Sequence, residues 1–246
     1  MKDTLWMGRT KLLIGEERLK KLNNANVLVV GLGGVGSFAA EFIARAGVGK
    51  MTIIDGDIVD PTNRNRQLPA LFSTHGMSKA SWMKGRLLGI NPELELTVLN
   101  QFMRVQPIKD LINSGNFNYV VDAIDSITPK LTIMSTCYFN NVPIISSMGA
   151  GGKLDPTLIR VADISKTYND KLAHAVRKRL KKYKIYKGIK TVFSPEHAPE
   201  GSLMLTDGSN FKKSAYGTMS YLPAAFGGAC ASVVVRDLID WVEIKK

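Results

Sequence analysis

A glycine-rich turn between an apolar strand and an amphipathic helix constrains this chain more than any other feature. A strand is predicted at residues 26–30, of which 27–30 are all apolar. Glycines follow at positions 31, 33, 34 and 36, and an apolar pattern of helical spacing covers residues 37–46. Glycines in such a turn let the backbone approach a phosphate closely, and the helix N-terminus offers N–H groups and a positive dipole. The sequence therefore predicts a nucleotide-binding turn formed by Gly31, Gly33, Gly34 and Gly36.

Strands and helices alternate through the first 150 residues. After the first strand, strands are predicted at residues 50–54, 95–100, 119–123 and 143–146. Helices are predicted at residues 16–22, 37–46, 78–88, 107–114 and 129–140. This alternation is typical of an α/β, Rossmann-like fold, an open and mainly parallel sheet with helices on both faces.

The alternation weakens after residue 150. A basic helix is predicted at residues 170–186, a loop-rich segment at 201–223 and an apolar helix at 224–242. We therefore predict a nucleotide-binding Rossmann-like domain at 1–150 and a basic helical and loop region at 151–246, packed on the first.

The positive charge of the chain is concentrated in that second region. Thirty-three Lys and Arg against 21 Asp and Glu give a net charge of +12, and residues 171–190 hold nine basic residues and no acidic one. Such a run is either a solvated helix face or a surface for a polyanion, so a nucleic-acid partner stays open.

Cysteine content and apolar run lengths favour the cytoplasm. The two cysteines, Cys137 and Cys230, do not form a disulfide framework, and each is expected to be a core thiol. The apolar runs are too short for a membrane helix, and no secretory signal follows Met1.

Polar residues after the second predicted strand favour ATP over NAD. Asp55 lies 19 residues past Gly36, where a carboxylate bonds a ribose hydroxyl in either class of enzyme. The segment 60–67 adds Asn63 and Arg66, which suit the phosphates while pyrophosphate leaves and have no counterpart in a hydride-transfer site. Taken alone, Asn63 and Asn65 are also ordinary turn residues.

Two further charged residues fall at the same predicted edge of the sheet. Lys79 opens the next helix and adds a cation, or is simply a solvated side chain. Asp125 follows the strand at 119–123, where a carboxylate suits magnesium or caps the next helix.

Together these motifs resemble the superfamily of ubiquitin-activating-type (ThiF/MoeB/HesA-like) enzymes, which adenylate a carboxylate. The motifs are GxGGxGS at 31–37, DxD at 55–57, NxxRQ at 63–67 and DxxD at 122–125. The resemblance implies an ATP site formed by Gly31, Gly33, Gly34, Gly36, Asp55, Asp57, Asn63, Arg66, Lys79 and Ser126. It also implies that Arg9, Arg66, Lys79 and Asp125 are catalytic and that Asp125 holds magnesium. Arg9 resembles an arginine finger that reaches into a partner subunit, which implies a homodimer.

The second half indicates a branch of that superfamily. The chain has no Cys-x-x-Cys pair, so no zinc is expected. Segments 146–157, 162–167, 170–177 and 192–194 resemble the tRNA threonylcarbamoyladenosine dehydratases, whereas the part of 196–213 after Pro199 matches them poorly. The resemblance implies ATP-dependent cyclisation, a net dehydration, of the threonylcarbamoyl group on the adenosine 3′ of the tRNA anticodon, by adenylation of its carboxylate.

The tRNA partner gives the basic run a role. We expect Arg177, Lys178, Lys181 and Lys182 to bind RNA, with Arg177 making a more specific contact near the nucleotide. Two alternatives remain: an activator of a sulfur-carrier or ubiquitin-like protein, and a noncatalytic nucleotide- or RNA-binding Rossmann protein. A protein partner that relays sulfur or electrons also stays open.

Overall fold

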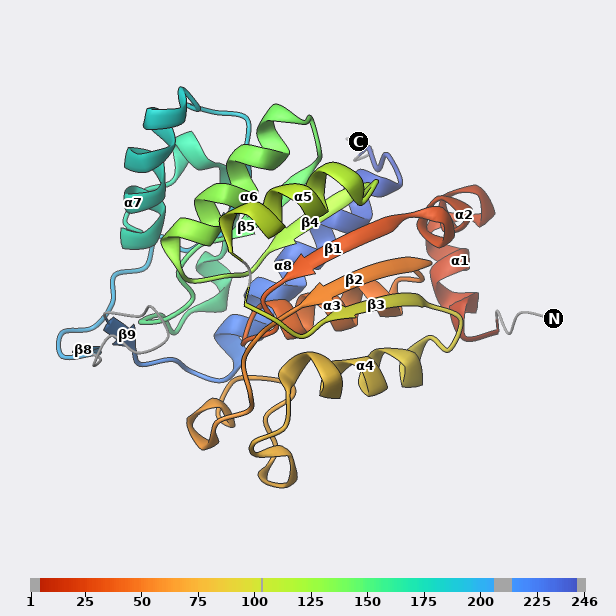
Figure 1. Ribbon diagram of the computed structural model, residues 1–246, viewed down its shortest axis with the longest axis horizontal. Coiled ribbons are helices and arrows are strands. Elements are labelled where there is room, and N and C mark those ends of the chain that lie inside the picture. Colours follow the sequence, from red (N-terminus) through yellow and green to blue (C-terminus); the bar gives the residue numbers. More distant parts are fainter. Residues whose placement is uncertain (1–4, 103, 206–213, 243–246) are drawn as a thin grey trace.

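The computed structural model describes residues 5–102, 104–205 and 214–242, and its centre is a seven-stranded sheet (Figure 1). The strand order is β3-β2-β1-β4-β5-β7-β6. The strands are β1 Asn26–Val30, β2 Lys50–Ile54, β3 Glu95–Leu99, β4 Tyr119–Asp122, β5 Ile144–Ser147, β6 Arg160–Asp163 and β7 Lys190–Phe193. All neighbours pair in parallel except β6 and β7, which are antiparallel. The predicted open, mainly parallel α/β fold is confirmed.

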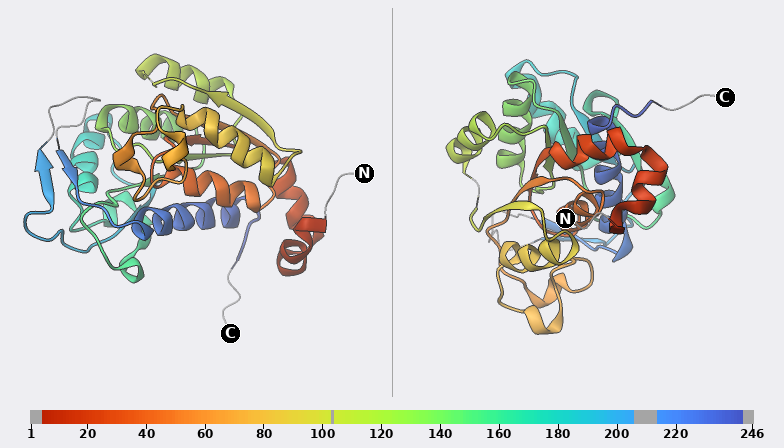
Figure 2. Two further views of the ribbon diagram at one scale, coloured as in Figure 1. Left: turned by 90° about the horizontal axis from the view of Figure 1, so that it is seen from below. Right: turned by 90° about the vertical axis from the view of Figure 1, so that its right-hand side faces the viewer.

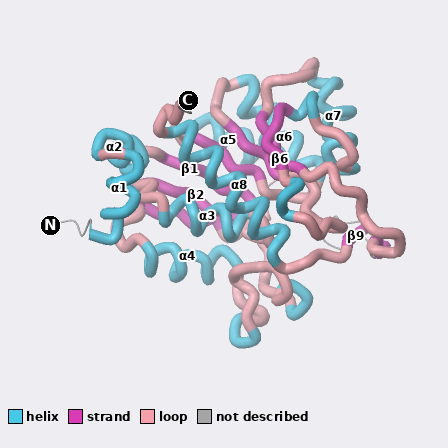
Figure 3. The backbone as a smooth tube through the Cα atoms, turned by 180° about the vertical axis from the view of Figure 1, so that it is seen from behind, coloured by secondary structure: helices cyan, strands magenta, loops and turns pink. Residues whose placement is uncertain are grey.

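Helices cover both faces of the sheet. The helices α3 Gly36–Arg45, α4 Lys79–Ile90 and α8 Tyr221–Leu238 pack on one face. Figure 3 shows them in front of the strands, and α5 Val105–Ser114, α6 Ile127–Phe139 and α7 Lys171–Leu180 lie on the other face (Figures 2 and 3). The central strands are therefore buried from both sides, which is why β1 is apolar without alternation.

The glycine turn leaves no room for a side chain at Gly36 and has a backbone conformation at Gly31 that favours glycine. A Cβ on Gly36 would lie 1.8 Å from the carbonyl oxygen of Gly31, and Gly31 itself has a φ of +88°. Both positions thus require glycine, because any Cβ would collide or strain the backbone.

The last helix packs directly on the last part of this turn, at Gly34 and Val35. A Cβ on Gly227 of α8 would lie 2.6 Å from the carbonyl oxygen of Val35, and one on Gly34 would lie 2.8 Å from Cβ of Pro223. Small residues at these contacts let α3 and α8 approach closely. The helix α8 therefore packs against the backbone of the glycine turn and supports it.

The first helices lie at the amino ends of the strands. The short helix η1 Leu5–Met7 leads into α1 Gly8–Ile14 and α2 Glu16–Asn24. The N–H group of Gly49, just before β2, donates to Leu22 of α2, and Met7 packs against Gly47. Figure 1 shows α1 and α2 at the end of the sheet opposite the hairpin of β8 Leu203–Leu205 and β9 Ser214–Tyr216.

The remaining short helices belong to connections. Two, η2 Pro61–Asn63 and η3 Phe72–Thr74, lie in the long excursion between β2 and α4, which projects from the body at the bottom of Figure 1. The others are η4 Pro156–Leu158, η5 Ile164–Lys166 and η6 Lys181–Tyr183.

The predicted basic helix is shorter than the expected 170–186. It ends at Leu180, passes through η6 and stops at Lys184, whose φ is 58°. Leu180 and Ile185 are both buried, at 1% exposure each. A continuous helix would place residues five apart on different faces, so the left-handed turn is what brings both side chains into the core.

The second region supplies more strand than its sequence indicated. Where helices and loops were expected after residue 150, β7 extends the sheet beside β5 and β6 pairs with β7. The segment expected to be loop-rich, 201–223, contains the β8–β9 hairpin and the start of α8, and its residues 206–213 lie outside the described part. Among the described helices, none combines the length and apolar character needed to span a membrane.

Candidate functional site

The site begins where β2 ends beside the glycine turn. Asp55 follows β2, and its Oδ2 accepts the N–H of Leu32 at 2.6 Å while Oδ1 accepts the N–H of Asp57 at 2.7 Å. Burial raises the pKa of the Asp55 carboxyl group, and the two backbone bonds and Lys79 oppose that rise. The carboxylate is thus fixed at the mouth of the turn, in the position that the sequence predicted for a ribose ligand.

A buried lysine lies next to this carboxylate. Lys79 begins α4 because Ser78 caps the helix, its Oγ accepting the N–H of Ser81 at 3.1 Å. Its Nζ lies 3.0 Å from Oδ2 of Asp57, and only 5% of its side chain is exposed. The ammonium group is therefore already paired, and an arriving phosphate would share it with Asp57.

The predicted phosphate-binding segment is ordered by its own hydrogen bonds. Asp60 caps η2, and Oδ1 of Asn63 accepts the N–H of Asp60 at 3.2 Å. Arg66 donates from Nη1 to the carbonyl oxygen of Thr62 and to Oδ1 of Asn65, both at 2.8 Å. Local bonds thus set the direction of the Arg66 side chain before any ligand binds.

The charge of Asp125 acts on Arg66 across the sheet edge. Burial lowers the pKa of the Arg66 guanidinium, and the negative charges of Asp125 and Asp60 oppose that shift. Asp125 is exposed in the loop after β4, and Ser126 is the N-cap residue of α6. Asp125 and Arg66 are therefore electrostatically coupled, although they lie 59 positions apart in the sequence.

The glycine turn borders this pair of charges. A Cβ on Gly34 would lie 3.3 Å from the carbonyl oxygen of Arg66, and one on Gly33 would meet only the Gln67 side-chain nitrogen at 3.8 Å. The structure thus brings the turn, Asp55 and the Arg66 segment to one edge, as predicted for a nucleotide site at the carboxyl ends of parallel strands.

Arg9 does not lie at this edge within one chain. It is on α1, two residues from Met7, which packs against Gly47 just before β2. Arg9 is exposed there, at the amino ends of the strands. Within a single chain it is therefore separated from the other predicted catalytic residues by the length of the sheet.

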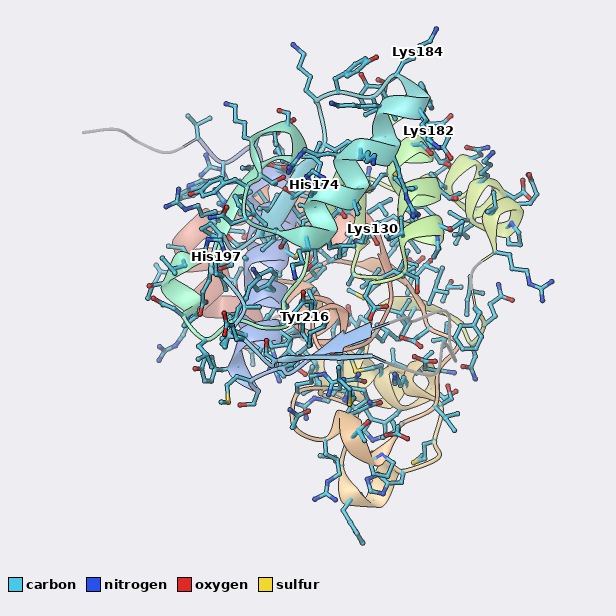
Figure 4. The ribbon with its side chains drawn as sticks, turned by 90° about the vertical axis from the view of Figure 1, so that its left-hand side faces the viewer. Lys130, His174, Lys182, Lys184, His197 and Tyr216 are labelled. Carbon is cyan, nitrogen blue, oxygen red and sulfur yellow. The ribbon has the colours of Figure 1, made fainter. Side chains whose placement is uncertain are left out.

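The predicted RNA-binding residues lie on α7 and η6. Lys178, Lys181 and Lys182 are exposed, and Figure 4 shows Lys182 and Lys184 near the outer end of α7. Arg177 is half-buried instead, with Nη1 donating to the carbonyl oxygen of Thr167 at 2.8 Å and to the Thr167 hydroxyl. These partners are not among the predicted nucleotide-binding residues, and the more specific contact of Arg177 near the nucleotide stays a prediction.

One buried ion pair beneath the site was missed from the sequence. Asp122 and Lys130 are both fully buried, with Nζ 2.7 Å from Oδ2. Lys130 also donates to the Ser147 carbonyl oxygen at 2.9 Å, and Ser146 Oγ donates to Asp122 at 2.5 Å. The pair links the ends of β4 and β5 to α6 and so positions the loop that carries Asp125. The available signal was a lysine at helical spacing among the inward-facing apolar residues of α6.

Both cysteines are core thiols. Cys137 and Cys230 are buried at 0% exposure, and burial raises the pKa of each thiol to about 12. At neutral pH neither is a thiolate, which is the nucleophilic form.

Comparison with known proteins agrees with this geometry. The model of the ThiF family matches residues 8–246. The tRNA threonylcarbamoyladenosine dehydratase of Bacillus subtilis (strain 168) is 42% identical over 97% of this chain and 96% of that protein. The solved structure of the E. coli tRNA N6-threonylcarbamoyladenosine dehydratase in complex with ATP matches with a TM-score of 0.88 at 36% identity, covering 96% of this chain and 95% of that one. The same E. coli enzyme in complex with AMP matches with a TM-score of 0.87 at 37% identity, with the same coverage. The chain therefore belongs to the ThiF family and, within it, to the tRNA threonylcarbamoyladenosine dehydratases.

Proposed function

We propose that this enzyme uses ATP to cyclise the threonylcarbamoyl group on the tRNA adenosine 3′ of the anticodon. The observation that carries the proposal is the group of Asp55, Arg66 and Asp125 around the glycine turn, in a chain that aligns over its length with dehydratases of that substrate. ATP is the nucleotide bound in the similar E. coli structure, and AMP is the ligand of its second complex.

The chemistry requires an activated carboxylate. The threonyl carboxylate attacks the α-phosphorus of ATP and pyrophosphate leaves, which gives an acyl adenylate. The neighbouring carbamoyl group then attacks the acyl carbon and AMP leaves, so the net change in the tRNA is loss of one water. Because the attack is intramolecular, proximity alone contributes several powers of ten in effective molarity.

The residues of the site fit that sequence of steps. Asp55 accepts hydrogen bonds from the ribose, and the N–H groups at the start of α3 face the phosphates. Arg66 and Lys79 neutralise the charge that grows on the leaving pyrophosphate, and the side-chain amide of Asn63 orients a phosphate oxygen. Asp57 holds Lys79 in place at 3.0 Å.

Magnesium fits this site through one carboxylate. Within the described residues no group of three His, Cys, Asp or Glu side chains gathers to hold a metal. Magnesium bound with ATP needs fewer protein ligands, because phosphates and water complete its shell. Asp125 is the exposed carboxylate at the correct edge, and the ion would neutralise phosphate charge there.

Two copies of the chain complete the proposed site. Arg9 lies at the opposite end of the sheet from Arg66, so it would act on a partner's nucleotide. The helix that carries it exposes apolar side chains, with Leu12 at 88% and Leu13 at 75% exposure. An exposed apolar patch of this kind suits burial against a second copy.

The basic surface of α7 and η6 supplies the contact with tRNA. Lys178, Lys181 and Lys182 are exposed and separate from the nucleotide cluster. Such a surface binds phosphates without competing for ATP. The second region, 151–246, therefore serves as the RNA-binding part.

The direct test is nucleoside analysis of tRNA. Purified protein, ATP, magnesium and tRNA carrying threonylcarbamoyladenosine should give a nucleoside lighter by one water, with AMP and pyrophosphate in equal amounts. Cells that lack the protein should lose the lighter nucleoside. Pyrophosphate release that depends on a ubiquitin-like carrier protein and not on tRNA would instead identify an activator of such carriers.

A further inference from the structure

We propose that the cavity under the end of α7 receives an unstacked base of the tRNA, a base other than the modified adenosine. The cavity has a volume of about 200 Å³ and lies between α7, η5 and residues 185–186. The inference rests on the proposed function, because it takes tRNA as the substrate. It adds a site for a second nucleotide, distinct from the ATP site, and this site shares Lys181 with the exposed basic surface.

The floor of the cavity is apolar. Ile164, Leu180 and Ile185 line it, and each is exposed by only 1%. A site built for a phosphate alone has no use for such a floor, since an anion gains nothing from apolar walls. A flat nucleobase does, because its ring faces are apolar and its edges are polar.

The rim of the cavity carries an aromatic ring and two cations. Tyr186 is 62% exposed, and Arg177 and Lys181 line the same cavity. Proteins that bind unpaired RNA stack bases on aromatic rings or on Arg planes and neutralise the adjoining phosphate with basic side chains. The three side chains supply both parts of that contact.

Arg177 is fixed in place before any ligand binds. Its Nη1 donates to the carbonyl oxygen of Thr167 at 2.8 Å and to the Thr167 hydroxyl. Thr167 is itself buried, and its hydroxyl donates to the carbonyl oxygen of Ile164 at 2.8 Å, the residue that forms part of the floor. Because Arg177 and the floor share these bonds, the cavity wall is preorganised.

The cavity lies away from the adenylation site. Asp170, the N-cap of α7, lies beside Gly149, just past the carboxyl end of β5, since a Cβ on Gly149 would lie 3.6 Å from Asp170 Oδ2. The helix then runs to Leu180, a length of about 15 Å at 1.5 Å per residue. We therefore assign the cavity to another nucleotide of the same loop and not to the adenosine whose side group is adenylated.

The test combines Tyr186→Ala with RNA that lacks single bases. We expect the affinity for an anticodon stem-loop to fall between about fivefold and 150-fold in Tyr186→Ala, with an unchanged salt slope. Tyr186→Phe keeps the ring and should bind like the wild type. Tyr183→Ala is the matched control, since Tyr183 is also exposed but does not line this cavity.

A double-mutant cycle identifies the base. Stem-loops with one abasic nucleotide are bound to wild type and to Tyr186→Ala. If a base occupies the cavity, removing that base lowers the affinity by the same factor as Tyr186→Ala. The loss of affinity when both changes are combined is then smaller than the product of the two separate losses. The proposal is overturned if no abasic position couples to Tyr186, while wild-type protein still binds and cyclises tRNA. Failure of the wild type to bind or cyclise tRNA would instead refute the proposed function.

Discussion

At the scale of single residues, the charge of Asp125 is the most sensitive point of the proposed site. Asp125→Asn removes that charge with little change in volume, so phosphate neutralisation through the carboxylate is lost while the fold is kept. We expect AMP formation in the presence of tRNA and ATP to fall at least about a hundredfold. The rate of AMP release measures the loss of activity, and thermal unfolding curves show whether the fold is kept.

The control for this substitution is Asp110→Asn, an exposed aspartate on α5 whose carboxylate accepts a hydrogen bond from Gln106 of the same helix. It should retain full activity. Near-normal AMP formation by Asp125→Asn would remove this residue from the proposed catalytic group.

The thiols should be dispensable for turnover. Since burial raises the pKa of Cys137 and Cys230 to about 12, both stay protonated at neutral pH and neither forms a thioester. Cys137→Ala and Cys230→Ala should keep most of the activity and lose only packing. Folded wild-type protein should resist alkylation by iodoacetamide until it is unfolded. A well-folded Cys230→Ala variant without activity would reopen a covalent mechanism.

The buried pair of Asp122 and Lys130 should matter for stability. Lys130→Met leaves a charged carboxylate buried without its cation, which costs about 3–5 kcal/mol in the free energy of unfolding. Adding Asp122→Asn should recover part of that loss, because the unpaired charge is then gone. Urea unfolding measures both variants, with Lys84→Met on the exposed face of α4 as the control. A loss below about 1 kcal/mol would show that the pair is not a constraint on the fold.

Residues of the site were predictable where a residue type suited to the chemistry also lies just after a predicted strand. Asp55 directly follows β2, and Arg66 follows it within one connection, so both are found from the order of motifs. Lys130 was not predicted as part of the site, because lysine is rarely buried. Its ion pair with Asp122 also depends on how α6 lies against β4 and β5. The placement of Arg177 against Thr167 also depends on tertiary structure, which the sequence pattern does not contain.

At the scale of elements, α7 with η6 is the part most open to direct test. Replacing Lys178, Lys181 and Lys182 with Glu should weaken tRNA binding and make its salt dependence shallower. The log–log slope should fall by about 0.7 to 0.9 for each phosphate that the variant no longer neutralises. ATP affinity should not change, because these residues lie outside the nucleotide cluster.

A control with the same change in net charge separates local binding from overall repulsion. Lys20, Lys50 and Lys84 are exposed and lie on α2, β2 and α4. Their replacement with Glu should affect tRNA binding much less. Equal losses in the two triple variants would mean that only net charge matters, and the basic surface would then have no specific role.

The predicted elements differ in accuracy for a physical reason. Strands 26–30 and 50–54 were placed at their observed bounds, because strands buried on both faces are mainly apolar along their length. The strands β6 and β7 have four residues each, and β6 shows no fully buried position. Their stability comes from pairing with β5 and with each other, which no local pattern reports.

At the scale of the whole molecule, the separation of Arg9 from Arg66 predicts catalysis shared between subunits. Arg9→Ala and Asp125→Asn should each be inactive alone. After the two variants are mixed and their subunits exchange, the mixture should recover about a quarter of wild-type activity. Half of the dimers then contain one subunit of each variant, and each of these dimers has one intact site. Activity assays after subunit exchange, with sedimentation to measure the mass, provide the check. No recovery in a mixture shown to exchange would exclude the shared site.

The packing of α8 on the glycine turn also has a consequence for biosynthesis. Gly227 and Pro223 support Val35 and Gly34, although roughly 190 residues separate these partners along the chain. A ribosome adding about 5 to 20 residues per second needs on the order of 10 to 40 s to supply that distance. During this interval the turn and α3 exist without the helix that covers them, and their apolar face is open to chaperones. Nascent chains arrested before α8 should accordingly show no protection of the turn by ATP, even though every glycine of the turn has already been synthesised.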